Sequence, residues 1–270
     1  MIKVEKSSEI KKENDVLMAK CTANVPGSPM SVYSFNIDGI LIDTGSSSLL
    51  EEFKPYFHEA DFDAVYITHF HEDHTGNAAY LQKEMDIPVF IHSSSASFTP
   101  KPFQIPIYRQ VVWGNSAPFS STALGETFTS RNHTWDVIET PGHTKDHVAF
   151  YNRDIGAMFT GDLFVSPKVK VVLAEENILN TRASLQKLLA YDFEDMYCCH
   201  AGYVKNGKKL IQLKIEYIDE LENKVLTLAK QGKDVHEITA ELFPTPYPII
   251  AISHTEWSPV HMVRVILNRG

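Results

Sequence analysis

Cysteine and long apolar runs are scarce in this chain, and each scarcity excludes a class of protein. The 270 residues include only 3 cysteines, two of them adjacent, which is a poor basis for a disulfide framework. No apolar stretch approaches the length of a membrane span. Residues 1–15 alternate Lys, Glu and Ser and lack the apolar segment of a secretory signal. These absences predict a soluble, cytoplasmic protein with no membrane partner.

Positive charge is also scarce, since the formal net charge is −9 at pH 7 and no long basic stripe is present. Nucleic-acid binding draws most of its affinity from basic residues that neutralise phosphate, so we expect a small-molecule substrate and no nucleic-acid partner. Within the basic cluster at residues 205–209, Lys208 is a candidate contact for an anionic substrate. The alternative, which we favour, is a solvated turn that leads into a helix.

What the chain does contain is a dense group of potential metal ligands at residues 69–74, with the sequence HFHEDH. The apolar run at 64–67 predicts a buried strand before it, and residues 76–85 predict a helix-like segment after it. The ligands would therefore lie on a strand-end loop held by rigid flanks. Imidazole and carboxylate together suit zinc and its first-row neighbours, so we interpret the loop as a metal site.

Three later turns each offer one more ligand. His143, Asp162 and His200 each follow a short apolar segment that predicts a strand. Zinc-dependent hydrolysis needs enough ligands to fix the ion and an open position for water. The repeated order of strand and then ligand would bring all of these side chains to one edge of a sheet sandwich.

At these residues the chain resembles the metallo-β-lactamase superfamily. The HxHxDH signature of the family is present at residues 69–74, its first motif matches residues 41–45, and the resemblance covers roughly residues 15–204. It implies an α/β fold, an αββα sandwich, with two divalent metal ions, zinc first and iron or manganese as alternatives. The resemblance assigns the first ion to His69, His71 and His143, the second ion to Asp73, His74 and His200, and the bridging position to Asp162.

This ligand set implies activation of water. Two cations bridged by a carboxylate can share a water and lower its pKa toward neutrality, which gives a bridging hydroxide that attacks the substrate. Asp73 is in addition a candidate catalytic residue that orients this water or accepts its proton. Asp43 is expected to hydrogen-bond a ligand or a water, and it is equally well explained as a turn-forming residue before Thr44.

Cys198 and Cys199 directly precede a ligand, His200. Strand alternation points one of them away from any site that the other reaches, so we interpret both as buried structural thiols rather than as zinc ligands. Lactamases of the best-known subclass place a cysteine on the second metal, where this chain has Asp162. That departure argues against a dedicated β-lactamase.

Residues 98–129 are rich in Pro, Ser and aromatic residues and show no clear periodicity. Long segments of this kind are often lids, so we expect this one to cover the metals and shape an apolar pocket. An ordinary surface loop that is anchored by a few aromatic side chains is nearly as good an interpretation.

From residue 205 the pattern becomes helical, with helices predicted at 210–228, 235–243 and 258–267. We therefore divide the chain into a catalytic domain, residues 1–204, and a helical C-terminal region, residues 205–270. The latter resembles the tail of glyoxalase II-like hydrolases, where it contributes substrate contacts or a homodimer interface.

Two residues near these features are further candidate substrate contacts. Tyr203 lies three residues after His200, and a buried core tyrosine is an equally good interpretation. His254 would reach the substrate if the tail folded over the site, but a structural role is favoured. The other histidines are interpreted as structural or solvent-facing: His58, His92, His133, His147, His236 and His261.

Two classes of function follow from the sequence. The leading hypothesis is a dinuclear metal hydrolase that cleaves a small ester-like bond, such as a thioester, a lactone or another carboxylic ester. The alternative is an oxidoreductase of the persulfide dioxygenase type, which uses a single iron on the same fold. Phosphodiester hydrolysis keeps the same ions and is disfavoured by the net charge of −9.

Overall fold

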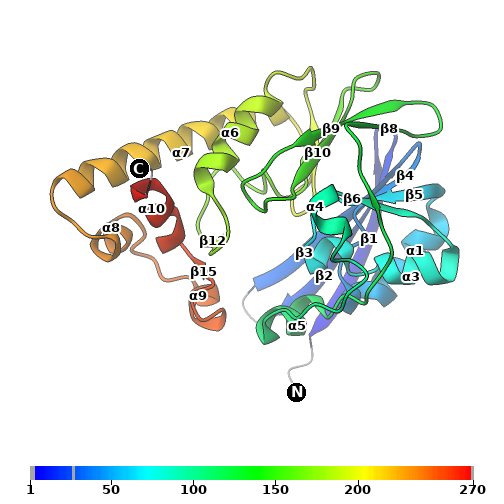
Figure 1. Cartoon of the computed structure of the whole chain (residues 1–270), viewed down its shortest axis with the longest axis horizontal. Coiled ribbons are helices and arrows are strands. Elements are labelled where there is room, and N and C mark those ends of the chain that lie inside the picture. The colour runs from blue at the N-terminus through cyan, green and yellow to red at the C-terminus, as the bar shows by residue number, and fades with distance from the viewer. Residues whose placement is uncertain (1–3, 26–27, 269–270) are drawn as a thin grey trace.

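The structure, a computed structural model, describes residues 4–25 and 28–268. Two β-sheets face each other, and helices cover the outer face of each, which gives an αββα sandwich (Figure 1). The predicted fold class is therefore confirmed.

The first sheet has the strand order β1-β2-β3-β4-β5-β6-β7. These strands span Glu5–Glu13 (β1), Val16–Val25 (β2), Ser28–Ile37 (β3), Gly39–Ile42 (β4), Phe62–Tyr66 (β5), Val89–Ile91 (β6) and Thr122–Ala123 (β7). Pairing is antiparallel from β1 to β4 and parallel from β4 to β7. The edge strand β1 is exposed and rich in Lys and Glu, which discourages pairing with another chain.

The second sheet has the order β14-β13-β11-β10-β9-β8. Its strands span Thr127–Thr129 (β8), Thr134–Glu139 (β9), Val148–Asn152 (β10), Ala157–Phe159 (β11), Met196–Cys198 (β13) and Gly202–Val204 (β14). Its neighbours pair antiparallel except for β11 and β13, which are parallel. Because β11 and β13 run in the same direction, the turns that follow them emerge at the same edge.

Aromatic side chains fill the space between the two sheets. Phe35 of the first sheet packs edge-on against Phe159 of the second, with ring centroids 5.4 Å apart. Tyr66 of the first sheet lies in the same cluster as Trp135 and Phe150 of the second. This interior holds the sheets in register and therefore fixes how their edges meet.

The outer faces of both sheets are covered by helices. Phe53 and Leu81 bury α1 and α3 against the first sheet, and Leu185 and Ile215 bury α6 and α7 against the second. The helical elements span Ser47–Leu49 (η1), Leu50–Glu59 (α1), Glu72–Thr75 (α2), Ala78–Met85 (α3), Ser93–Ala96 (α4), Ile107–Trp113 (α5), Ile178–Leu188 (α6), Gly207–Lys230 (α7), Val235–Leu242 (α8), Pro248–Ile252 (α9) and Val260–Leu267 (α10). Within the described ranges, no helix is long and apolar enough to cross a membrane.

The C-terminal region contains the three predicted helices as α7, α8 and α10. A short additional helix, α9, begins at Pro248, which suits the first helical position because proline lacks an N–H. Helices α7 and α10 share one apolar cluster with the second sheet. A separate two-stranded sheet also joins the tail to the sandwich, since β12 (Val172–Leu173) pairs with β15 (Trp257–Ser258). The division at residue 204 stays a prediction.

Two helices near the metal loop differ from the sequence-based expectation. The helix predicted at 76–85 is preceded by α2, which begins inside the ligand motif. Residues 98–129 contain α5, which the sequence did not reveal. Ile107 and Val111 of α5 are 77% and 56% exposed, whereas Trp113 at its end is buried, so the apolar residues of this helix do not lie on one buried face.

Candidate metal centre

The predicted ligands all lie in turns at one edge of the sandwich. The loop with residues 69–74 follows β5 of the first sheet, and the turns with His143, Asp162 and His200 follow β9, β11 and β13 of the second. Backbone hydrogen bonds join these turns, from the Val148 N–H to the Thr68 carbonyl and from the Cys199 N–H to the Gly161 carbonyl. The edge is therefore a rigid frame built from both sheets.

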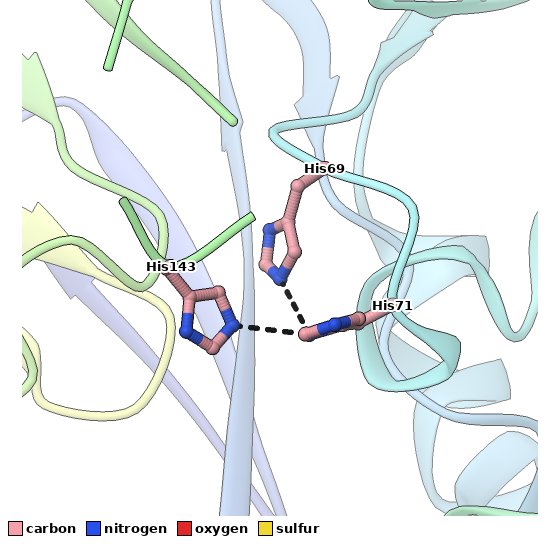
Figure 2. Close-up of side chains that lie close together, drawn as sticks. All are labelled: His69, His71 and His143. Atoms are coloured by element: carbon pink, nitrogen blue, oxygen red, sulfur yellow. Dashed lines mark hydrogen bonds between the residues drawn. The ribbon is translucent and has the colours of Figure 1, made fainter. Parts of the chain in front are cut away.

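His69, His71 and His143 form the first ligand group (Figure 2). The Nδ1 atom of His71 lies 3.1 Å from Nε2 of His69 and 3.0 Å from Nε2 of His143. A neutral Nδ1 carries at most one hydrogen, so protons on His71 alone cannot satisfy both contacts. Three imidazole nitrogens that converge in this way match the donor set of a zinc or iron ion.

Asp73, His74, Asp162 and His200 form the second ligand group. Nε2 of His200 lies 3.3 Å from Oδ2 of Asp73 and 3.0 Å from Oδ2 of Asp162. The same Asp162 oxygen is 3.6 Å from Nε2 of His143 in the first ligand group. The carboxylate of Asp162 therefore lies between the two groups, as expected of a bridging ligand.

Each of the five imidazoles has its outer nitrogen against a hydrogen-bond acceptor. The contacts are His69 Nδ1 to Thr68 Oγ1 (3.1 Å), His71 Nε2 to Glu175 Oε1 (3.2 Å), His74 Nδ1 to Asp43 Oδ2 (2.8 Å), His143 Nδ1 to Glu176 Oε2 (3.2 Å) and His200 Nδ1 to the Ser31 carbonyl (2.7 Å). An outer N–H donated to such an acceptor leaves the inner nitrogen with a free lone pair, which is the form that binds metal.

The buried polar atoms also fit a bound cation. His74 Nε2 and Asp162 Oδ1 are buried and have no hydrogen-bond partner among the described residues. Burial alone would lower the pKa of His200, but the carboxylates of Asp162 and Asp73 raise it well above its usual value. A divalent ion can replace such protons as the positive charge beside these carboxylates, so the residues present fit the expected metal.

The carboxylate of Asp43 makes several hydrogen bonds behind the ligands. It is fully buried; its Oδ1 accepts the Thr68 N–H at 2.8 Å, and its Oδ2 accepts the Thr68 hydroxyl and faces His74, both at 2.8 Å. Cys199 Sγ lies 2.9 Å from the same Oδ2, and burial raises the pKa of this thiol, which keeps it protonated as a donor. Cys198 points into a different apolar cluster, as strand alternation requires.

His147 supports the bridging ligand, Asp162. The sequence pattern indicates only a structural or solvent-facing role for His147 and does not identify this contact. Its Nε2 accepts the Asp162 N–H at 3.0 Å, and its Nδ1 lies 2.8 Å from the Thr140 hydroxyl. Burial, and then the charge of His143, lower its pKa and keep the ring neutral. The one signal in the sequence was its place four residues after His143.

Acidic partners of the ligands were also missed. Glu175 and Glu176 contact two ligands of the first group, and Glu72 lies inside the ligand motif and pairs with Arg109. Arg109 also reaches Glu256 of the C-terminal region, with Nη1 3.4 Å from Oε1. These pairs join residues that are far apart in sequence, so no local pattern marks them.

Two of the three candidate substrate contacts lie away from the ligand groups. The Tyr203 hydroxyl donates to Asp195, before β13, whereas His200 follows that strand. Lys208 Nζ lies 4.0 Å from Asp192 in the same loop. The structure therefore does not bring these two side chains to the ligand groups. His254 is exposed, and its role stays a prediction.

Part of the 98–129 segment does lie against the metal loop. The ring of Trp113 is 6.3 Å from that of His200, and Phe103 lies 4.9 Å from Phe70, between centroids. Arg109 of α5 contacts the ligand helix α2 through Glu72. These contacts agree with a covering segment, while its action as a lid stays a prediction.

A family model described as the metallo-beta-lactamase superfamily matches residues 32–200. The chain belongs to this superfamily. The ligand-bearing turns fall within the matched range, so the superfamily assignment and the geometry refer to the same site.

Two relatives of this superfamily member are hydrolases by name, and a third is named as lactamase-like. A hydroxyacylglutathione hydrolase from Halorhodospira halophila is 32% identical over 61% of this chain and 57% of that protein. The thioesterase pkgB from Emericella nidulans is 29% identical over 64% of this chain and 44% of that protein. The lactamase-like protein notP from an Aspergillus species is 25% identical over 82% and 64% of the two chains. The chain thus spans less than two thirds of the length of these three relatives.

Solved structures show the same fold along nearly the whole chain. A beta-lactamase domain protein from Burkholderia ambifaria superposes with a TM-score of 0.70 at 14% identity, covering 96% of this chain and 87% of that one. A metallo-beta-lactamase family protein from Thermus thermophilus gives 0.67 at 18% identity, covering 94% and 93%. The family model therefore shows the superfamily, and the solved structures show the fold.

Proposed function

We propose that this enzyme binds two divalent ions, zinc in the first instance, and hydrolyses a small ester-like substrate: a thioester, a lactone or another carboxylic ester. The observation that carries the proposal is the position of the Asp162 carboxylate, 3.0 Å from His200 Nε2 of the second ligand group and 3.6 Å from His143 Nε2 of the first. The names of two relatives, a hydroxyacylglutathione hydrolase and a thioesterase, support the substrate class.

The residues of the chain prepare the site for this reaction. When bound, a pair of divalent ions lowers the pKa of water and polarises the bond to be cleaved. Burial alone would raise the pKa of the Asp73 carboxyl, but the charges of His74 and His200 hold it below its usual range. Asp73 is therefore ionised at neutral pH and can orient a water or accept its proton. Asp43 and His147 hold the ligands in place through the hydrogen bonds described above.

The complete second ligand group favours the dinuclear hydrolase over the dioxygenase alternative. A single iron would need only the first group, whereas His74 and His200 also have their outer nitrogens bonded to Asp43 and to the Ser31 carbonyl. These contacts leave the inner nitrogens of His74 and His200 free to bind a second ion.

Elemental analysis of the purified protein, followed by a substrate panel of thioesters, lactones and phosphodiesters, tests the proposal. We expect about two zinc ions per chain and turnover of a thioester or a lactone. The variants His71→Ala and Asp162→Ala should lose metal and activity while far-ultraviolet circular dichroism stays unchanged, and the surface variant Glu220→Gln should behave as wild type. One iron with oxygen consumption on a persulfide, or turnover of phosphodiesters alone, would refute it.

A further inference from the structure

Two consecutive carboxylates lie behind two imidazoles of the first ligand group. Glu175 Oε1 is 3.2 Å from His71 Nε2, and Glu176 Oε2 is 3.2 Å from His143 Nδ1. Both contacts involve the outer nitrogen of the imidazole. Each carboxylate therefore holds the ring proton on that nitrogen and leaves the inner nitrogen free to bind an ion.

The loop that carries these carboxylates is held by backbone contacts on both sides. Glu176 Oε1 accepts the Leu173 N–H at 2.8 Å, while the Glu176 N–H donates to the Leu173 carbonyl at 3.1 Å. The Asn177 N–H donates to the Gly142 carbonyl at 2.8 Å, next to His143 itself. The Glu176 side chain is only 12% exposed. Its carboxylate is therefore fixed relative to the ligand that it contacts.

The C-terminal region holds the other end of this loop. Leu173 belongs to β12, which pairs with β15, and the register places Leu173 opposite Trp257. The residue before Trp257, Glu256, contacts Arg109, which in turn binds Glu72 in the ligand motif. The tail thus supports the first ligand group from two directions.

The ligands of the second group have different partners. His200 has a neutral carbonyl, that of Ser31, at its outer nitrogen, and His74 shares the buried Asp43 carboxylate with Thr68. A carboxylate partner makes an imidazole more basic and adds negative charge close to the ion, whereas a carbonyl adds no net charge. Loss of Glu175 or Glu176 should therefore affect the two ion positions unequally.

We propose that Glu175 and Glu176 are positioning residues that set the affinity of the first ligand group for its ion, and that the β12–β15 pairing holds the loop that carries them. The inference rests on the proposed function in that it assumes the first ligand group binds a divalent ion. It does not depend on the substrate or on a second ion.

Glu176→Gln is the sharpest test, because an amide cannot accept both hydrogen bonds that the carboxylate accepts. If the amide oxygen keeps the Leu173 N–H, the amide NH₂ faces His143 Nδ1 and moves the ring proton to Nε2, the nitrogen that should bind the ion. If the amide turns over, its NH₂ opposes the Leu173 N–H. Glu175→Gln should have a smaller effect on ion affinity, because the Glu175 side chain is 60% exposed. This second variant still tests the inference if Glu176→Gln does not fold.

The experiment measures zinc binding to the metal-free protein in competition with a chelator, and zinc occupancy at the two positions in crystals equilibrated at a fixed free zinc concentration. We expect Glu176→Gln to weaken binding at the first ligand group by about 10–100-fold, the range typical of partners behind metal ligands, and to leave the second group within about threefold. Glu220→Gln, on the exposed face of α7, should change neither, and thermal unfolding of the metal-free protein measures separately how far each variant changes the stability of the fold.

Two results would overturn the inference: a first-group affinity within about twofold of wild type in both variants, or an equal loss at both ion positions. The second result would mean that the loop acts only through general stability. If wild-type protein binds one ion, at the first ligand group, and Glu176→Gln weakens it, the dinuclear proposal fails while this inference holds. Occupancy of the second group alone, or no metal binding, contradicts both.

Discussion

Replacing Arg109 by methionine should destabilise the protein strongly, because it removes the cation from a buried ion pair. Arg109 donates from Nε and Nη2 to the two carboxylate oxygens of Glu72, both at 2.6 Å, and the two side chains are only 12% and 1% exposed. Without Arg109 the Glu72 carboxylate stays buried next to metal ligands with no cation. Removal of one partner of such a pair costs about 3–5 kcal/mol of unfolding free energy.

The double variant Arg109→Met with Glu72→Met separates the ion pair from simple packing. Replacing both members of a buried pair with apolar residues of similar size is often close to neutral, so we expect the double variant to recover at least half of the loss. The coupling free energy between the two positions should exceed about 1.5 kcal/mol. Arg131→Met is the matched control, because Arg131 pairs with exposed Asp61 and Asp63 and is itself 40% exposed. That change should cost less than about 1 kcal/mol.

Urea unfolding of the metal-free proteins, followed by tryptophan fluorescence, measures these free energies without a contribution from bound zinc. An Arg109→Met variant as stable as Arg131→Met would refute the reasoning. So would single-variant costs that simply add in the double variant, because the two residues would then stabilise the fold independently.

Two further predictions concern a glycine and a surface carboxylate. Gly161 has φ +49, and a Cβ there would lie 2.5 Å from His147 Nε2. Gly161→Ala should therefore cost at least about 2 kcal/mol more of unfolding free energy than Gly232→Ala, where φ is +84 and nothing lies within 4 Å. Chemical denaturation measures the two unfolding free energies, and zinc analysis measures the metal that each variant binds. For Asp38, burial alone would raise the carboxyl pKa, but hydrogen bonds from Ser130 and the following residues lower it. The stabilisation by the Asp38 carboxylate is therefore present above the unfolded pKa of about 3.9 and is lost as the pH falls through the lower folded value. Asp38→Asn should cost about 1 kcal/mol of unfolding free energy at pH 7 and progressively less below about pH 4. A difference in unfolding free energy between wild type and variant that stays constant from about pH 7 to about pH 3 would contradict this.

The ligand loop and the helical tail could be predicted from sequence because their signals are local. The ligand motif at residues 69–74 places four potential ligands in one loop, and the apolar period of α7 repeats along a single helix. Helix α5 could not be predicted in this way, since its apolar side chains Ile107 and Val111 face outward. Helix α2 was missed because the ligand motif itself forms its first turn.

The sequence by itself determined which residues are potential ligands and the order in which they occur, because each ligand-bearing turn comes after a segment with the pattern of a strand. Only the tertiary structure decided what lies behind those ligands. Glu175 meets His71 across 104 positions of sequence, and Arg109 meets Glu256 across 147. Such contacts depend on how two sheets pack and where a tail folds back, and a pattern along the chain carries no record of them. Long-range contacts at the outer nitrogens decide which nitrogen is free to bind a metal in four of the five histidines: His71, His74, His143 and His200.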